Sequence, residues 1–150
     1  MEVRSAIWLS ERIAPATRTM DTLLKAFGGC EAVYAAEKND YLAAGVTNEK
    51  ALKALLDKDL KSAGDTLERC ERLAIRLIPY ASDEYPERLA NVYAPPALLY
   101  AQGEPLDADS RPLISIVGTR DCTEYGRKAA YVMAGKLAAR GFFDAIVSEK

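Results

Sequence analysis

A strand–turn–helix–strand pattern in the last third of the sequence constrains the fold most. Residues 113–117 form a mostly apolar run rich in β-branched side chains, which is typical of a strand buried on both faces of a parallel sheet. Gly118-Thr119-Arg120 then predicts a turn. A helix is expected over residues 125–140 and a second strand over residues 145–147. Because parallel strands need a crossover connection, the sequence predicts a right-handed βαβ unit.

Two shorter strands are expected before this unit, over residues 75–78 and 97–101, with turns at Tyr85-Pro86 and Pro95-Pro96. These strands and one βαβ unit are too few for a doubly wound sheet, which usually has five or six strands. We therefore expect residues 75–150 to form an incomplete Rossmann-like domain, truncated within its sheet.

The first 74 residues show helical periodicity instead. Met20, Leu23, Leu24 and Phe27 have the spacing of one helical face, and Gly28-Gly29 follows them. Further helices are expected over residues 31–36, from residue 38 to before Gly45, after Thr47, and over residues 60–73. The predicted fold class is thus α/β with an all-α N-terminal domain over residues 1–74, similar to SAM or helix-hairpin-helix domains.

Composition excludes several classes of function. The chain has 150 residues, 49% of them hydrophobic and 28% charged, as in soluble globular proteins. It contains no histidine, which excludes Ser-His-Asp and Cys-His catalysis and histidine metal sites. Cys30, Cys70 and Cys122 lack CxxC spacing and are expected to be buried or incidental thiols. With no signal peptide and no long apolar run, we expect a cytoplasmic protein without membrane contact.

Charge is distributed unevenly along the chain. The net charge is −2, but residues 111–150 hold seven basic and four acidic side chains, a net charge of +3. Residues 1–110 carry a net charge of −5. Any nucleic-acid site must therefore be local, and the mildly basic part of the chain is the βαβ unit rather than the helical half. The mixed charges from Lys58 to Arg76 are interpreted as a solvated helix face.

The turn after residues 113–117 is the strongest candidate site. Parallel α/β sheets bind ligands beyond the carboxyl ends of their strands, and a helix N-terminus attracts anions. Gly118 would allow close approach, Arg120 would bind phosphate, and Thr119 or Thr123 would donate a hydroxyl. The pattern is neither GxGxxG nor a P-loop. A tight structural turn with a solvated Arg120 is the alternative.

Other residues favour structural roles. Gly28-Gly29 is interpreted as a helix C-cap rather than a DNA-binding helix-hairpin-helix turn. Trp8 and Tyr34 are expected in the core. Tyr85 and Tyr93 lie beside prolines, where packing is favoured over base stacking.

Together the motifs resemble the DNA-processing protein A (DprA/Smf) family. The motifs are Tyr85-Pro86-Glu87-Arg88-Leu89, the run Ala-Pro-Pro-Ala-Leu-Leu-Tyr at 94–100, Gly103, Ile116-Val117-Gly118-Thr119-Arg120 and Tyr125-Gly126. The helical half is similar to that family's N-terminal domain, so the resemblance covers essentially the whole chain.

The resemblance implies a Rossmann-like domain that binds single-stranded DNA without sequence preference. Such proteins protect incoming DNA in natural transformation and load the RecA recombinase onto it. They act as homodimers and have no established catalytic activity, and no cofactor is expected. By this resemblance, Gly118, Thr119 and Arg120 line the DNA pocket, and Tyr125 and Gly126 lie beside it.

The sequence departs from the family pattern at three places. Ala14-Pro15-Ala16 stands where many members have a glycine-rich hairpin, and Phe143-Asp144 looks like extra length or altered sequence at the second strand. Glu149-Lys150 follows Ser148 where members continue into a glycine-rich segment. Two alternatives therefore stay open. One is a nucleotide-binding Rossmann enzyme related to the lysine-decarboxylase-like phosphoribohydrolases, and the other is a truncated product without function.

Overall fold

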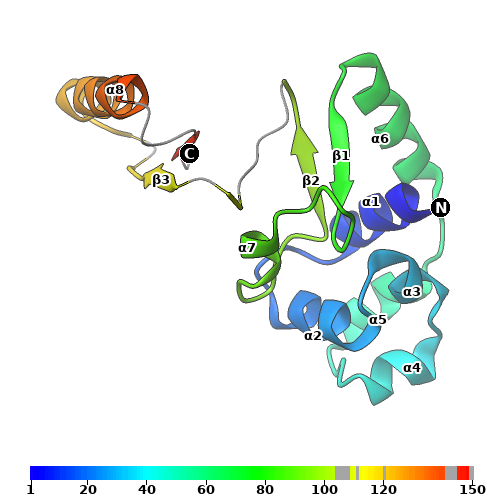
Figure 1. Ribbon diagram of the computed structural model, residues 1–150. Coiled ribbons are helices and arrows are strands. Elements are labelled where there is room, and N and C mark those ends of the chain that lie inside the picture. Colours follow the sequence, from blue (N-terminus) through cyan, green and yellow to red (C-terminus); the bar gives the residue numbers. More distant parts are fainter. Residues whose placement is uncertain (104–108, 111, 120, 141–144, 149–150) are drawn as a thin grey trace. The chain divides into compact units, whose positions relative to one another are not determined.

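The computed structural model describes residues 1–103, 109–110, 112–119, 121–140 and 145–148 (Figure 1). The chain divides into two compact units, Met1–Gly103 and Glu104–Lys150. The first contains α1 (Glu2–Arg12), α2 (Arg18–Phe27), α3 (Cys30–Ala35), α4 (Lys38–Ala43), α5 (Glu49–Leu56), α6 (Lys61–Arg72), β1 (Arg76–Pro79), α7 (Glu87–Ala90) and β2 (Leu98–Ala101). The second contains β3 (Leu113–Ile116), α8 (Glu124–Ala139) and β4 (Ala145–Ser148). Within the described residues, no helix is both long enough and apolar enough to cross a bilayer.

Local sequence signals set the helix boundaries of the first unit. The Thr17 hydroxyl accepts a hydrogen bond from the amide of Met20 at the start of α2. Gly28 ends this helix with a φ of 74°, and its amide donates to the carbonyl of Leu24. Glycine adopts this left-handed conformation readily, so the C-cap interpretation of Gly28 is confirmed.

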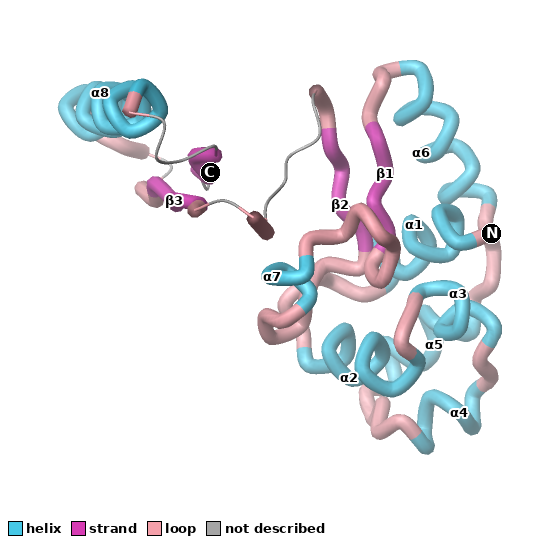
Figure 2. The backbone as a smooth tube through the Cα atoms, in the orientation of Figure 1, coloured by secondary structure: helices cyan, strands magenta, loops and turns pink. Residues whose placement is uncertain are grey.

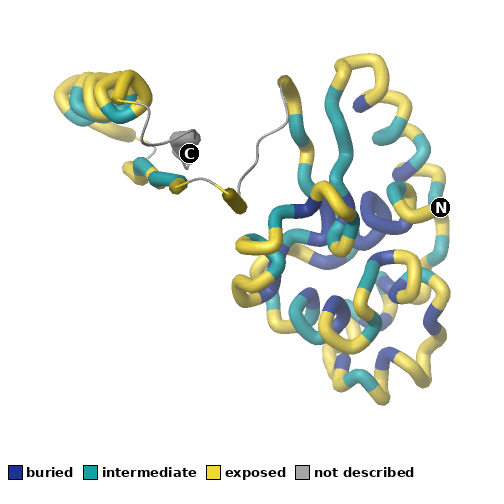
Figure 3. Tube along the Cα trace, in the orientation of Figure 1, coloured by how far each residue is buried: buried dark blue, intermediate teal, exposed yellow. Residues whose placement is uncertain are grey.

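The core of the first unit surrounds α1. This helix packs against α3, α5, α6 and both strands of the unit. Ile7, Trp8 and Leu9 are fully buried, as are Met20 and Leu23 of α2 (Figure 3). Placement of Trp8 in the core is therefore confirmed. Successive buried residues along α1 show that its surface is covered on more than one side.

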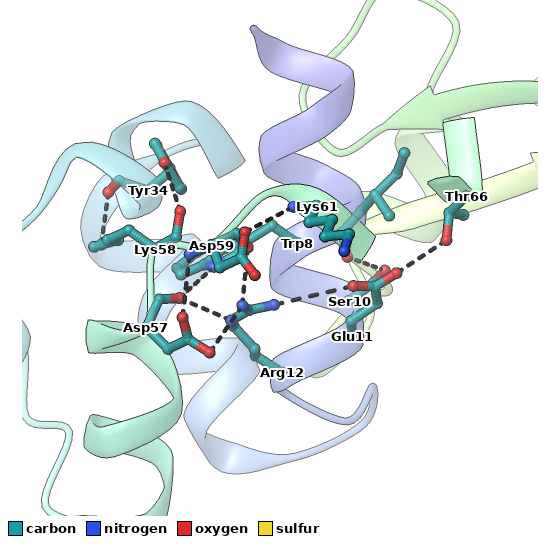
Figure 4. A network of polar contacts seen from close by, with 11 residues as sticks. Trp8, Ser10, Glu11, Arg12, Tyr34, Asp57, Lys58, Asp59, Lys61 and Thr66 are labelled. Carbon is teal, nitrogen blue, oxygen red and sulfur yellow. Dashed lines mark hydrogen bonds and ion pairs between the residues drawn. The ribbon is translucent and has the colours of Figure 1, made fainter. Parts of the chain in front are cut away.

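The half-buried Lys58 contacts aromatic rings and joins α3 and α4 to the segment between α5 and α6. Figure 4 shows it beside Tyr34. Lys58 Nζ lies 4.9 Å from the ring centroid of Trp8, 5.2 Å from that of Tyr34 and 5.1 Å from that of Tyr41. Cation–π attraction favours this arrangement. The ammonium also donates to the carbonyl oxygens of Tyr34 and Ala36, at 2.6 and 3.0 Å, and to Tyr41 Oη, at 2.6 Å.

Arg12 and Trp8 fix the same segment to α1. The Asp57 carbonyl accepts hydrogen bonds from Trp8 Nε1 at 2.8 Å and from Arg12 Nε at 2.9 Å. Arg12 also donates to the carbonyl of Asp59 at 3.0 Å. Burial, with a smaller contribution from repulsion by Arg12, lowers the pKa of Lys58. Lys58 is thus an exception to the solvated face expected from Lys58 to Arg76, because its ammonium has protein acceptors, whereas the charged side chains of α6 are exposed as expected.

The first unit includes two strands that the sequence placed in the second domain. β1 pairs antiparallel with β2, with Arg76 opposite Ala101 and Pro79 opposite Leu98 (Figure 2). Both strands pack against α1, and Leu98 joins the helical core. The boundary between the compact units thus falls after Gly103, whereas the sequence suggested a boundary between residues 74 and 75.

The second unit contains the predicted strand–helix–strand arrangement. β3 pairs parallel with β4, with Leu113 opposite Ala145 and Ile116 opposite Ser148, and α8 connects them. The expectation that residues 113–117 are buried on both faces is wrong, because Ser115 and Val117 are exposed and the others are half-buried. Two strands and one helix offer too little surface to cover them. The described strands form two-stranded sheets, so a Rossmann-like sheet stays a prediction.

Lys58→Met tests the enclosed ammonium. The change keeps most of the aliphatic length but removes the donor to two carbonyl oxygens and one hydroxyl, and unfulfilled buried acceptors are costly. We expect the free energy of unfolding to fall by about 2–3 kcal/mol in urea titrations followed by Trp8 fluorescence. Lys53→Met, at an exposed position of α5, is the matched control and should change it by less than about 0.5 kcal/mol. Equal stability of the two variants would contradict the role given to Lys58.

Candidate nucleic-acid interface

The turn that follows β3 is open to solvent. Val117, Gly118 and Thr119 are all exposed. A Cβ atom added at Gly118 would meet no described heavy atom within 4 Å. Gly118 is therefore required neither by a positive φ nor by a close protein contact, and its backbone is accessible to a ligand.

Thr123 defines the start of α8. Its Oγ1 accepts a hydrogen bond from the amide of Gly126 at 3.1 Å, and its carbonyl accepts one from the amide of Arg127 at 3.0 Å. Thr123 is thus the N-cap of α8, and the hydroxyl contact with phosphate expected of it stays a prediction. The same bond occupies the Gly126 amide, which leaves this amide unsuited to an anion.

The first turn of α8 still offers donors. The amides of Glu124 and Tyr125 precede the first intrahelical bonds, so the helix provides no acceptor for them. The dipole of a 16-residue helix adds partial positive charge at this end, although Glu124 opposes it. An anionic group beside Gly118 and Thr119 would thus lie near the amide donors and the positive end of the dipole of α8.

Arg120 and Tyr125 are two further residues of the predicted site. Arg120 lies outside the described residues, so its role as a phosphate ligand stays a prediction. Tyr125 is in the first turn of α8 and its side chain is 83% exposed. Its ring is therefore available for contact next to the turn.

The cysteines differ sharply in environment. Cys30 and Cys70 are buried, whereas Cys122 is exposed next to the cap residue Thr123. Burial raises the pKa of the Cys30 thiol to about 12, and its Sγ lies 3.5 Å from the carbonyl oxygen of Ala97, to which it donates. The described residues contain no cluster of cysteines and carboxylates able to hold a metal ion. Burial of two of the three thiols agrees with the sequence interpretation.

Tyr85 and Tyr93 have different surroundings despite their similar sequence context. Tyr85 is buried, its hydroxyl donates to the Pro96 carbonyl at 2.8 Å, and its ring contacts that of Tyr80. Packing is therefore confirmed for Tyr85. Tyr93 is 63% exposed, so the packing expected there is wrong, because the chain leaves its ring in solvent.

Comparison with known proteins assigns the family. The sequence model of one family, DNA recombination-mediator protein A, matches residues 76–149. The DNA processing protein DprA of Bacillus subtilis (strain 168) is 30% identical over 101 residues. This chain belongs to the DNA-processing protein A family. The family resemblance seen in the sequence is thus confirmed, over part of the chain rather than essentially all of it.

The family match includes the whole candidate site. Its residues 76–149 contain β1, β2, the β3–α8 turn and α8. The alignment with the Bacillus protein covers 65% of this chain and 34% of that protein, so the chain spans about a third of the relative. No solved structure matches the chain significantly.

Thiol labelling tests the geometry around the turn. Because Cys122 is exposed and the other two cysteines are buried, N-ethylmaleimide should modify one thiol rapidly in the native chain. Cys30 and Cys70 should react only after unfolding in urea. Peptide mass spectrometry identifies the modified residue, with Cys122→Ser as the control. Rapid native labelling of Cys30 would contradict the described core.

Proposed function

We propose that this chain binds single-stranded DNA without sequence preference at the turn between β3 and α8. The proposed contacts are the backbone of Gly118 and Thr119, the Arg120 guanidinium and the first amides of α8. Thr123 and Gly126 shape the turn, and Tyr125 contacts the strand beside it. The observation that carries the proposal is the open space at Gly118, which lies within the segment matched by the family.

The chemistry of the turn supports a backbone-directed mode of binding. Main-chain amides and a guanidinium recognise phosphate oxygens, which are the same in every nucleotide. The net charge of +3 over residues 111–150 adds attraction of the same kind. Nothing in this set of donors distinguishes one base from another, and this explains the lack of sequence preference.

The cellular role proposed here follows from family membership. We propose that the protein protects single strands and helps load RecA during natural transformation and recombination, in the cytoplasm and as a homodimer. It would act by binding rather than by catalysis, and without a cofactor. The family match and the relation to the Bacillus protein support a role in DNA processing, of which these steps are the specific form proposed.

Arg120→Ala tests the mode of binding. Loss of one phosphate contact should weaken affinity for oligo-dT and for mixed sequences alike, by roughly three- to tenfold, and lower the salt slope by about 0.7. Fluorescence anisotropy with labelled oligonucleotides at several salt concentrations measures both quantities.

The matched control is Arg4→Ala, which removes the same charge from an exposed position of α1 in the other unit. It should leave affinity nearly unchanged. If Arg120→Ala bound both oligonucleotides as tightly as the unmodified chain, with the same salt slope, the turn would not be the DNA site.

A further inference from the structure

The exposed side of α8 carries large aromatic and basic side chains together. Its half-buried positions are Gly126, Ala129, Ala130, Ala134 and Leu137. The opposite side displays what we call the α8 stripe, formed by Tyr125, Lys128, Tyr131, Val132, Gly135 and Lys136. All six members are exposed, and all except the glycine are large. Most of α8 is exposed in Figure 3.

The spacing of the stripe brings its members close to one another. Lys128 lies three residues before Tyr131 and four before Val132, and Lys136 lies four after Val132, so these side chains are neighbours on the helix surface. Tyr131 is 82% exposed and Tyr125 is 83% exposed. A Cβ atom at Gly135 would meet nothing within 4 Å, so the surface one turn after Tyr131 is unobstructed.

Beyond Glu124 at its start, α8 carries charge of one sign. Residues 125–139 contain three basic side chains and no acidic one. The members from Lys128 to Lys136 extend over about 12 Å along the helix axis. Proteins that bind single-stranded nucleic acids combine exposed aromatic rings with basic side chains. The bases stack on the rings, and the phosphates lie near the cations. An apolar protein partner would have no need of the lysines.

We propose that the α8 stripe is a second contact surface for single-stranded DNA, on which Tyr131 stacks with an unpaired base and Lys128 and Lys136 neutralise flanking phosphates. The inference rests on the proposed function and extends it from the turn to the solvent side of α8. A duplex offers no free base faces, so Tyr131 discriminates single strands from duplexes, whereas the lysines attract both.

The test compares Tyr131→Ala and Tyr131→Phe by anisotropy, on labelled oligo-dT and on a duplex of equal length. We expect Tyr131→Ala to weaken binding to the single strand by about fivefold or more, since loss of one stacked base has an effect of this size. Tyr131→Phe keeps the ring and should bind normally, and duplex binding should be the same for all three chains. Lys136→Gln should weaken the binding of both oligo-dT and the duplex and reduce the salt slope of both affinities.

Tyr93→Ala is the matched control, because Tyr93 is exposed in the other unit. If Tyr131→Ala and Lys136→Gln bind oligo-dT normally while Arg120→Ala does not, the stripe inference is overturned and the proposed turn site stands. If the unmodified chain fails to bind oligo-dT at any salt concentration, both proposals fail. A change in oligomeric state of Tyr131→Ala with unaltered affinity would identify a protein interface instead and overturn the inference.

Discussion

The first unit depends on the contact between the Lys58 ammonium and three aromatic rings. Trp8 comes from α1, Tyr34 from α3 and Tyr41 from α4, so one cation joins three helices to the segment that leads into α6. Its hydrogen bonds use carbonyl oxygens near the end of α3 that the helix leaves without donors. This arrangement positions α6 and, through it, the β1–β2 hairpin that packs on α1.

Local patterns were sufficient to predict most elements of this structure. The spacing of Met20, Leu23 and Leu24 and the glycine after Phe27 define α2, and apolar runs with prolines define β1 and β2. Contacts between distant residues were not predictable. Lys58 lies in a charged stretch, and its enclosure depends on aromatic residues 17 to 50 positions away in sequence, as the hydrogen bond to Tyr41 illustrates. The packing of β1 and β2 on α1 was not predictable for the same reason, because it joins residues that are distant in sequence.

The candidate site shows the same division. The strand, turn and helix around Gly118 follow from sequence, because each has a strong local signal. That Thr123 uses its Oγ1 to cap α8 depends on where the helix begins, and the sequence predicted a start at residue 125 rather than at Glu124. The exposed Tyr131 of α8 was missed, although a helical projection of residues 125–139 places it on the same side as Lys128 and Gly135.

In the proposed function, single-stranded DNA occupies the open turn between β3 and α8. Cys122 lies in this turn and is a natural reporter of it. The direct measurement is the rate at which N-ethylmaleimide, a neutral reagent, modifies Cys122 with and without saturating oligo-dT. The account predicts severalfold slower modification when the strand is bound. An unchanged rate, under conditions where anisotropy shows the oligonucleotide fully bound, would contradict it.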